Sequence, residues 1–187
     1  MGNLNIGIRH LLPIYPFAFL LLSFGAKELY IKLGKGTKKI FVGLLAILGV
    51  WYAGSSLFAF PHYISYYNEL AGGIEKGYTI AVDSNYDWGQ DFYRLRDFVR
   101  KNNIDRISLD YFGGEDPEYW LGSKVTKLDP FQTPHPTGWI AVSLNQLVGG
   151  TARPVAGFDQ PSGYYQWLVS HKPVAKAGTS IFIYHIQ

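Results

Sequence analysis

Residues 40–60, IFVGLLAILGVWYAGSSLFAF, form a stretch of 21 residues without a charged side chain. An α-helix rises about 1.5 Å per residue, so this stretch matches the ~30 Å hydrocarbon core of a bilayer. A second apolar run, LLPIYPFAFLLLSFGA at residues 11–26, precedes it and continues to the interface through residues 29–31. We therefore expect residues 1–60 to form a two-helix transmembrane hairpin, with helices at about 11–33 and 40–60, in contact with membrane lipid.

The segment between the two runs predicts the orientation of the hairpin. Residues 27–39 contain five lysines and one acidic residue, Glu28. Short lysine-rich loops stay on the cytoplasmic side. The sequence thus predicts a multi-pass protein of the inner or plasma membrane with residues 61–187 in an extracytoplasmic domain. Two alternatives for the first run are a buried helix of a soluble core and a secretory signal peptide, although its prolines and the lack of a small-residue cleavage site disfavour the latter.

Charge is divided unevenly along the chain. Residues 1–60 hold six basic residues against one acidic, a net of +5, whereas residues 61–187 hold eleven against thirteen, a net of −2. The basic excess therefore belongs to the hairpin, and no nucleic-acid partner is expected. The sequence has no cysteine, which excludes disulfides and thiolate metal sites. About 120 residues suffice for one hydrophobic core without such links.

Residues 61–187 alternate between strand and helix patterns. After a juxtamembrane helix at about 61–73, strands are expected at about 78–82, 106–111, 124–128, 138–144 and 179–186, and helices at about 90–102, 117–121 and 164–170. A loop rich in Gly, Pro and Asp is expected after residue 144. This alternation predicts a small α/β sheet with right-handed crossovers. The expected fold class is α/β, with an N-terminal two-helix transmembrane hairpin followed by a small extracytoplasmic α/β sheet domain.

The polar turn DSNYDWGQD, residues 83–91, follows the first expected strand and precedes a helix, where α/β sheets bind ligands. Its carboxylates, amides and indole are the groups that read sugar hydroxyls and sugar rings. The predicted saccharide-binding residues are Asp83, Asn85, Asp87, Trp88, Gln90 and Asp91.

A structural alternative remains open for the same turn. Asp83 and Asn85 can bond their own loop backbone, Asp87 can cap the following helix, and Trp88 can pack beneath it.

No metal site or cofactor is expected. Asp83, Asn85 and Asp87 match positions one, three and five of a calcium loop. However, Trp88 stands where that loop requires glycine, and Arg94 stands where it requires a bidentate glutamate. The five histidines are scattered, and the sequence contains no zinc, P-loop or dinucleotide-binding motif.

Arg9 and His10 lie just before the first apolar run. At the outer headgroup level an arginine can hold a lipid phosphate through a bidentate pair, and His10 can add a donor. They are the predicted lipid-phosphate-binding residues, with contact to ordinary headgroups as the alternative.

Four segments, NIGIRHLLPIYPF, PHYISYYNELAGG, DSNYDWGQD and GTSIFIYHI, resemble the C-terminal region of bacterial polytopic glycosyltransferases of the GT-C class, related to the dolichyl-phosphate-mannose protein mannosyltransferases. The resemblance covers nearly the whole chain. It implies transfer of a sugar from a polyprenyl-phosphate-linked donor on the extracytoplasmic face.

The catalytic acid of that family lies in its first outer loop, which has no counterpart here. We therefore expect a truncated product, a fragment or a split subunit that is inactive without the N-terminal transmembrane part. A different hypothesis is a membrane-anchored, non-catalytic α/β module that binds saccharides or serves as an accessory.

Overall fold

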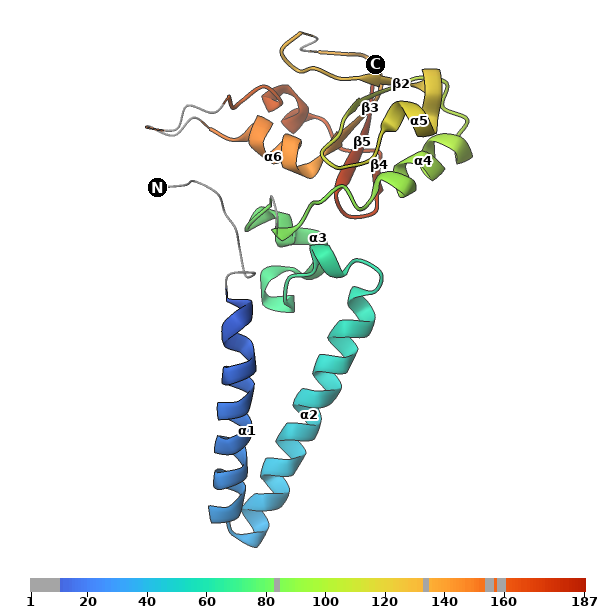
Figure 1. Ribbon diagram of the computed structural model, residues 1–187. Coiled ribbons are helices and arrows are strands. Elements are labelled where there is room, and N and C mark those ends of the chain that lie inside the picture. Colours follow the sequence, from blue (N-terminus) through green and yellow to red (C-terminus); the bar gives the residue numbers. More distant parts are fainter. Residues whose placement is uncertain (1–10, 83–84, 133–134, 154–156, 158–160) are drawn as a thin grey trace. The chain divides into compact units, whose positions relative to one another are not determined.

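The computed structural model describes residues 11–82, 85–132, 135–153, 157 and 161–187. The chain divides into two compact units, Met1–Tyr63 and Ile64–Gln187 (Figure 1). The sequence predicts this boundary between residues 60 and 61. Each unit is described by itself.

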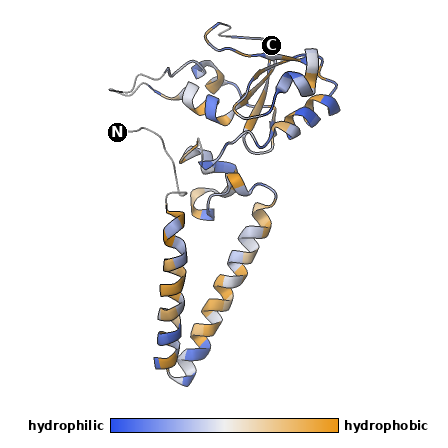
Figure 2. Ribbon diagram, viewed as in Figure 1, coloured by the Kyte–Doolittle hydropathy of each residue, from blue (hydrophilic) through white to orange (hydrophobic). Residues whose placement is uncertain are grey.

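The first unit consists of two long apolar helices. Its elements are η2 (Leu12–Ile14), α1 (Tyr15–Lys32) and α2 (Lys35–Ala59). The helices diverge from their connecting turn, and apolar residues occupy most of their length (Figures 1 and 2). Both Leu12–Lys32 and Lys35–Ala59 are long and apolar enough to cross a membrane.

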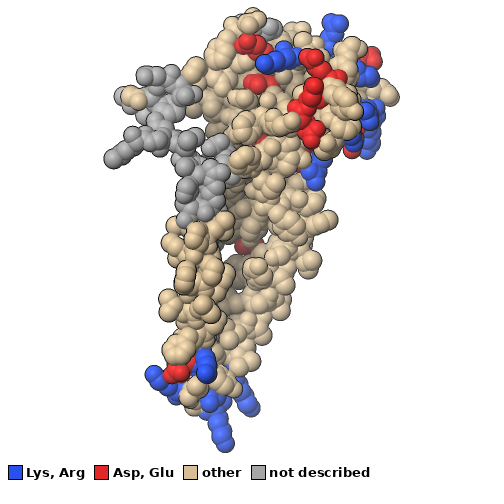
Figure 3. All heavy atoms as spheres, viewed as in Figure 1, with Lys and Arg blue, Asp and Glu red and all other residues tan. Residues whose placement is uncertain are grey.

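The lysine-rich segment is mostly helical, whereas a loop up to residue 39 was expected. Only Leu33 and Gly34, both in extended backbone, connect the helices, and α2 begins at Lys35. Lys38 packs over the ring of Tyr30, with its Nζ 4.8 Å from the ring centroid. Lysine is a good helix former, so the chain resumes a helix directly after the turn. Figure 3 shows the basic side chains gathered at this end of the unit.

The second unit is a mixed α/β domain built on a five-stranded sheet in the order β2-β1-β3-β5-β4. The strands are β1 (Ile107–Asp110), β2 (Val125–Lys127), β3 (Gly138–Ser143), β4 (Ala175–Ala177) and β5 (Ile181–Ile186). β1 runs parallel to β2 and β3, with Ile107 opposite both Val125 and Trp139. β5 is antiparallel to β3 and β4.

The helices α4 and α6 lie on opposite faces of this sheet, and the helices and turns of this unit follow in chain order (Figure 1). They are η3 (Tyr63–Ser65), η4 (Glu69–Ala71), α3 (Gly73–Lys76), η5 (Gly77–Thr79), α4 (Phe92–Lys101), α5 (Pro117–Leu121), η7 (Gly122–Lys124), α6 (Leu144–Thr151) and η8 (Gln166–Ser170). Successive strand residues point to opposite faces. Ile181 and Ile183 accordingly join the core under α4, while Phe182 and Tyr184 join the core under α6.

Residues 78–82 form no strand, contrary to the sequence prediction, and begin in the helical turn η5. Their apolar side chains are used differently. Tyr78 packs edge-on against the rings of Tyr86 and Phe182, and the Tyr67 hydroxyl donates to the Ala81 carbonyl at 3.0 Å. The alternating pattern thus reflects aromatic packing beneath the sheet.

Three further predictions are corrected. The single juxtamembrane helix at 61–73 is replaced by the short turns η3 and η4, and Gly72 ends η4 in a left-handed conformation at φ 89°. The expected glycine-rich loop after residue 144 begins with the helix α6, and the edge strand β4 was not foreseen. The remaining predicted strands and helices of this unit are present within a few residues of their expected bounds.

Candidate functional site

The structure describes only some of the predicted ligand-binding residues. Arg9, His10 and Asp83 lie outside the described residues. The rest of the DSNYDWGQD turn precedes α4, but it does not follow a strand, so its predicted position at a strand end is wrong.

Asp87 is fully buried and bonds to the backbone of two segments. Its Oδ1 accepts from the Gly89 amide at 2.9 Å, and its Oδ2 accepts from the Asn145 amide at 3.3 Å. Asn145 lies in the first turn of α6, whose N-cap residue Ser143 makes no side-chain cap. Asp87 therefore caps α6 rather than α4. Burial raises the pKa of the Asp87 carboxyl, and the two amide hydrogen bonds oppose that rise.

Asp91 is also fully buried and holds the turn between β4 and β5. Its Oδ2 accepts from the amides of Thr179 and Ser180 at 2.8 and 2.9 Å. Its Oδ1 accepts from Arg94 Nη1 at 2.6 Å. Gly178, at φ +60°, permits this close approach, because a Cβ there would overlap the Asp91 carboxylate. The carboxylate thus serves backbone donors that are distant in sequence.

The amides of the turn are likewise engaged within the fold. Asn85 Nδ2 donates to the Val82 carbonyl at 3.4 Å. Gln90 Nε2 donates to Ser65 Oγ at 3.1 Å, and its Oε1 accepts from the Trp88 amide at 2.8 Å. The Trp88 side chain does not pack beneath α4, since the residue is 52% exposed. Among the described turn residues, Trp88 presents the large solvent-facing surface.

Gly89 connects the turn to the loop that follows β1. The Tyr111 hydroxyl donates to the Gly89 carbonyl at 2.9 Å. A Cβ on Gly89 would approach the Gly113 Cα to 2.5 Å, and a Cβ on Gly113 would overlap the Tyr111 ring. Because neither glycine has a Cβ, the loop lies directly against the turn. The hydrogen bond to Gly89 then fixes the position of the Tyr111 ring.

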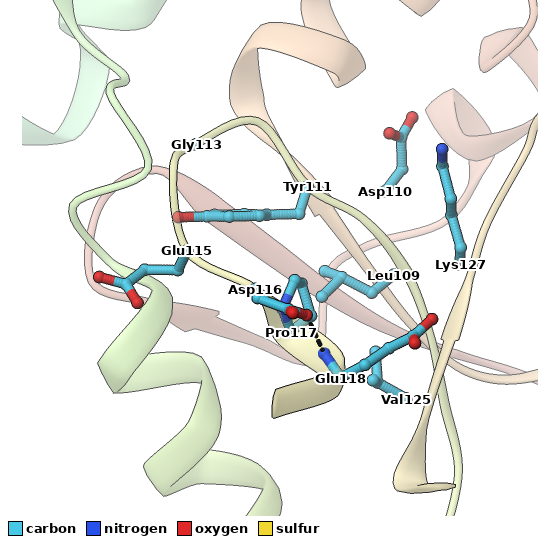
Figure 4. Close-up of a pocket in the computed structure, with 10 residues that line it drawn as sticks. All are labelled: Leu109, Asp110, Tyr111, Gly113, Glu115, Asp116, Pro117, Glu118, Val125 and Lys127. Carbon is cyan, nitrogen blue, oxygen red and sulfur yellow. Dashed lines mark hydrogen bonds between the residues drawn. The ribbon is translucent and has the colours of Figure 1, made fainter. Parts of the chain in front are cut away.

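A pocket of about 270 Å³ lies at the carboxyl ends of the parallel strands β1 and β2. We call it the strand-end pocket. Its lining includes Leu109, Asp110, Tyr111, Pro117, Val125 and Lys127, together with the acidic side chains of the loop and first turn of α5 (Figure 4). The carboxyl ends of strands are where open α/β sheets bind their ligands.

Asp110, the last residue of β1, is the half-buried polar group of this pocket. Its Oδ2 accepts from the Tyr165 hydroxyl at 2.7 Å. Among the described residues, none donates to its Oδ1. Burial raises the pKa of the Asp110 carboxyl, while the Tyr165 hydrogen bond and the Lys127 charge oppose the rise. A carboxylate with a raised pKa beside a pocket is a candidate for ligand binding or proton transfer.

The remaining acidic side chains differ in what they offer a ligand. Glu115 turns away from the pocket in Figure 4 and accepts from the Tyr93 hydroxyl at 2.9 Å and from Trp120 Nε1 at 3.0 Å. Asp116 caps α5 by accepting from the Glu118 amide at 2.9 Å. Glu118 itself is exposed at the rim. The carboxylates that face a ligand are thus those of Asp110 and Glu118.

This pocket is not among the predicted sites, although the sequence carries a signal for it. The segment DYFGGEDPE, residues 110–118, combines carboxylates and aromatics directly after a buried strand. Residues 110–118 therefore occupy the strand-end position at which α/β sheets bind ligands. No group of three or more potential metal ligands occurs among the described residues.

Comparisons with known proteins do not narrow the function. No protein-family model, no curated protein and no solved structure matches this chain.

Proposed function

We propose that the chain is the C-terminal portion of a membrane glycosyltransferase that takes a sugar from a polyprenyl-phosphate-linked donor on the extracytoplasmic face. The observation that carries the proposal is the apolar surface of α1 and α2, each with an 18-residue apolar window that is 0% buried. Apolar surface of this extent is covered by lipid or by other membrane helices. A long apolar helix pair followed by an α/β unit is also the order that the GT-C resemblance implies.

The proposed location is the inner or plasma membrane, with a multi-pass topology and residues 61–187 outside. The supporting observation is the concentration of Lys32, Lys35, Lys38 and Lys39 at the connection between α1 and α2. Lysines beside a membrane helix favour the cytoplasmic side.

Cysteine labelling tests this topology, because the sequence has no cysteine of its own. Gly36→Cys lies in the first turn of α2, and Ser123→Cys lies at an exposed position of η7. An impermeant thiol reagent on intact cells is expected to label only Ser123→Cys, whereas permeabilised cells should label both. Labelling of Gly36→Cys alone in intact cells would reverse the proposed orientation.

In the proposed division of roles, the catalytic acid belongs to a separate N-terminal transmembrane part. Arg9 and His10 would contact the donor phosphate, and the α/β unit would shape the acceptor site. Asp87 and Asp91 are occupied by backbone amides. That occupation supports a structural use of the turn and leaves the strand-end pocket as the place for an acceptor.

An assay with labelled polyprenyl-phosphate sugar tests the activity. The chain alone should give no transfer, because a glycosyl transfer needs a positioned base beside the acceptor and the donor-binding part is expected elsewhere. Addition of the N-terminal transmembrane part should restore transfer. Robust transfer by the chain alone would contradict this division of roles and make Asp110 the candidate base.

The alternative is a membrane-anchored, non-catalytic module that binds saccharides. The second unit favours it by having its own core and pocket. Saccharide binding without transfer in every combination with a membrane part would select this alternative.

A further inference from the structure

We infer that the strand-end pocket binds a single uncharged hexopyranose ring. The choice of a sugar among small polyhydroxyl ligands rests on the proposed function. The choice of this pocket, its size limit and its charge preference rest on the geometry of the second unit.

The volume of the strand-end pocket limits the size of its ligand. The pocket has a volume of about 270 Å³, close to the lower end of the ~300–1,000 Å³ that small-molecule sites occupy. It therefore accommodates one ring rather than an oligosaccharide. Further residues of a glycan would extend into solvent past the rim at Glu118.

The side chains that line the pocket suit a sugar ring. The Tyr111 ring lies across the pocket, and Leu109, Pro117 and Val125 add apolar surface (Figure 4). Flat aromatic and apolar surface suits the C–H face of a pyranose. Asp110 Oδ1 and the Glu118 carboxylate accept hydrogen bonds from hydroxyl groups, and the Lys127 ammonium donates to their oxygens.

The charged groups at the pocket favour an uncharged ligand. Tyr93 and Trp120 bind Glu115, the first turn of α5 binds Asp116, and Lys127 partly neutralises Asp110. The oxygens of Glu115 and Asp116 are engaged by donors within the fold, so the exposed Glu118 is the carboxylate left for a cation to bind. A uronate or phosphate would face the carboxylates of Asp110 and Glu118 against the one ammonium of Lys127, so anionic ligands are disfavoured.

Hydrogen bonds within the fold hold two of the lining side chains in place. The Tyr111 hydroxyl is tied to Gly89, and the Tyr165 hydroxyl is tied to Asp110. The aromatic wall and the central carboxylate are thus both held before a ligand arrives. Pre-organised groups lose little conformational entropy on binding. This is the use that the geometry gives to the DSNYDWGQD turn, which braces the pocket instead of forming it.

The test is a binding titration with the full chain in lipid nanodiscs. The neutral probes are methyl mannopyranoside and methyl glucopyranoside, the anionic probe is methyl glucuronide, and saturation-transfer NMR measures binding. We expect millimolar binding of at least one neutral probe. The dissociation constant of the glucuronide should be at least about tenfold higher.

Two substitutions assign the site. Asp110→Asn keeps an acceptor for Tyr165, and Glu118→Gln changes an exposed side chain, so both variants should fold. Each is expected to weaken binding about tenfold through loss of a charged acceptor. The matched control is Asp105→Asn, whose side chain is fully exposed outside the pocket, and it should bind as wild type does.

Three results would overturn the inference: no binding of either neutral probe, equal binding of the glucuronide, or equal affinity in all three variants. The transfer assay of the proposed function is separate. Transfer without probe binding would reject the pocket and keep the glycosyltransferase, whereas probe binding without transfer would do the reverse.

Discussion

Replacing Asp91 with alanine should destabilise the second unit severely, because its buried carboxylate is the acceptor for two backbone amides. Its Oδ2 lies 2.8 Å from the Thr179 amide and 2.9 Å from the Ser180 amide. Each buried donor left without a partner costs about 1–3 kcal/mol. The Thr179 hydroxyl adds less, since its contact with Asp91 Oδ2 is long at 3.3 Å and it keeps Ser65 Oγ at 2.6 Å.

The other terms are smaller or offset the loss. Arg94 is 39% exposed in its pair with Asp91, so that pair is worth about 0–1 kcal/mol. Alanine also relieves the cost of burying a charge. We expect a net loss of about 2–4 kcal/mol for Asp91→Ala, against total stabilities of about 5–15 kcal/mol. Asp91→Asn keeps one acceptor oxygen and should cost about 1 kcal/mol.

Urea unfolding of the full chain in detergent, followed by near-ultraviolet circular dichroism, measures these differences. Hydrogen exchange of the Thr179 and Ser180 amides gives a local measurement, and both amides should exchange faster in Asp91→Ala. The matched control is Arg94→Gln, which should lose no more than about 1 kcal/mol. A free energy of unfolding for Asp91→Ala within about 1 kcal/mol of wild type would refute the assignment of Asp91 as the acceptor for this turn.

Three further predictions address the same unit. Gly178→Ala should lower the free energy of unfolding by more than ~1 kcal/mol, because φ is +60° and the new Cβ meets Asp91; thermal melts measure it, and a neutral result would contradict the close approach. Trp88→Ala should cost less than ~1 kcal/mol, since the residue is 52% exposed; a loss of about 3–5 kcal/mol, typical of a buried tryptophan, would show that it belongs to the core. Burial raises the pKa of Asp110 above its ordinary 3.8, so the folded state binds more protons there, and its contribution to stability falls as pH rises from about 3.8 through the folded pKa. Asp110→Asn should remove that decrease in a comparison of melts across pH, and identical pH profiles for the two proteins would contradict it.

Local features of the sequence determined several elements of this protein. The uncharged run at residues 40–60 is helical through Ala59, the last residue of α2, because helix length and hydrophobicity are properties of contiguous residues. A helix is expected at about 117–121, and α5 begins at Pro117 with Asp116 as its cap. The apolar face of α4, with Phe92, Leu95 and Val99 buried, likewise follows from its helical spacing.

Residues 78–82 and α6 required the tertiary structure. The apolar residues at 78–82 alternate as a strand does, yet Tyr78 meets Phe182 from the far end of the chain, and that aromatic contact replaces a strand pairing. α6 contains two glycines, which lower its intrinsic helix propensity. Its first turn is nevertheless capped by Asp87, a residue 58 positions away. The helix propensity of residues 144–151 does not include a capping residue that is distant in sequence.

The candidate site divides in the same way. The sequence alone determined which residue types were present for saccharide chemistry, since the carboxylates, amides and aromatics of residues 83–91 and 110–118 can be read directly. Only the tertiary structure decided which of them face solvent. Asp87 accepts from one amide 58 positions away, and Asp91 accepts from two amides 88 and 89 positions away. Asp110 instead ends a strand beside an open pocket. A carboxylate is equally able to bind a backbone amide or a ligand, and the long-range hydrogen bonds of the fold determine which of the two it meets.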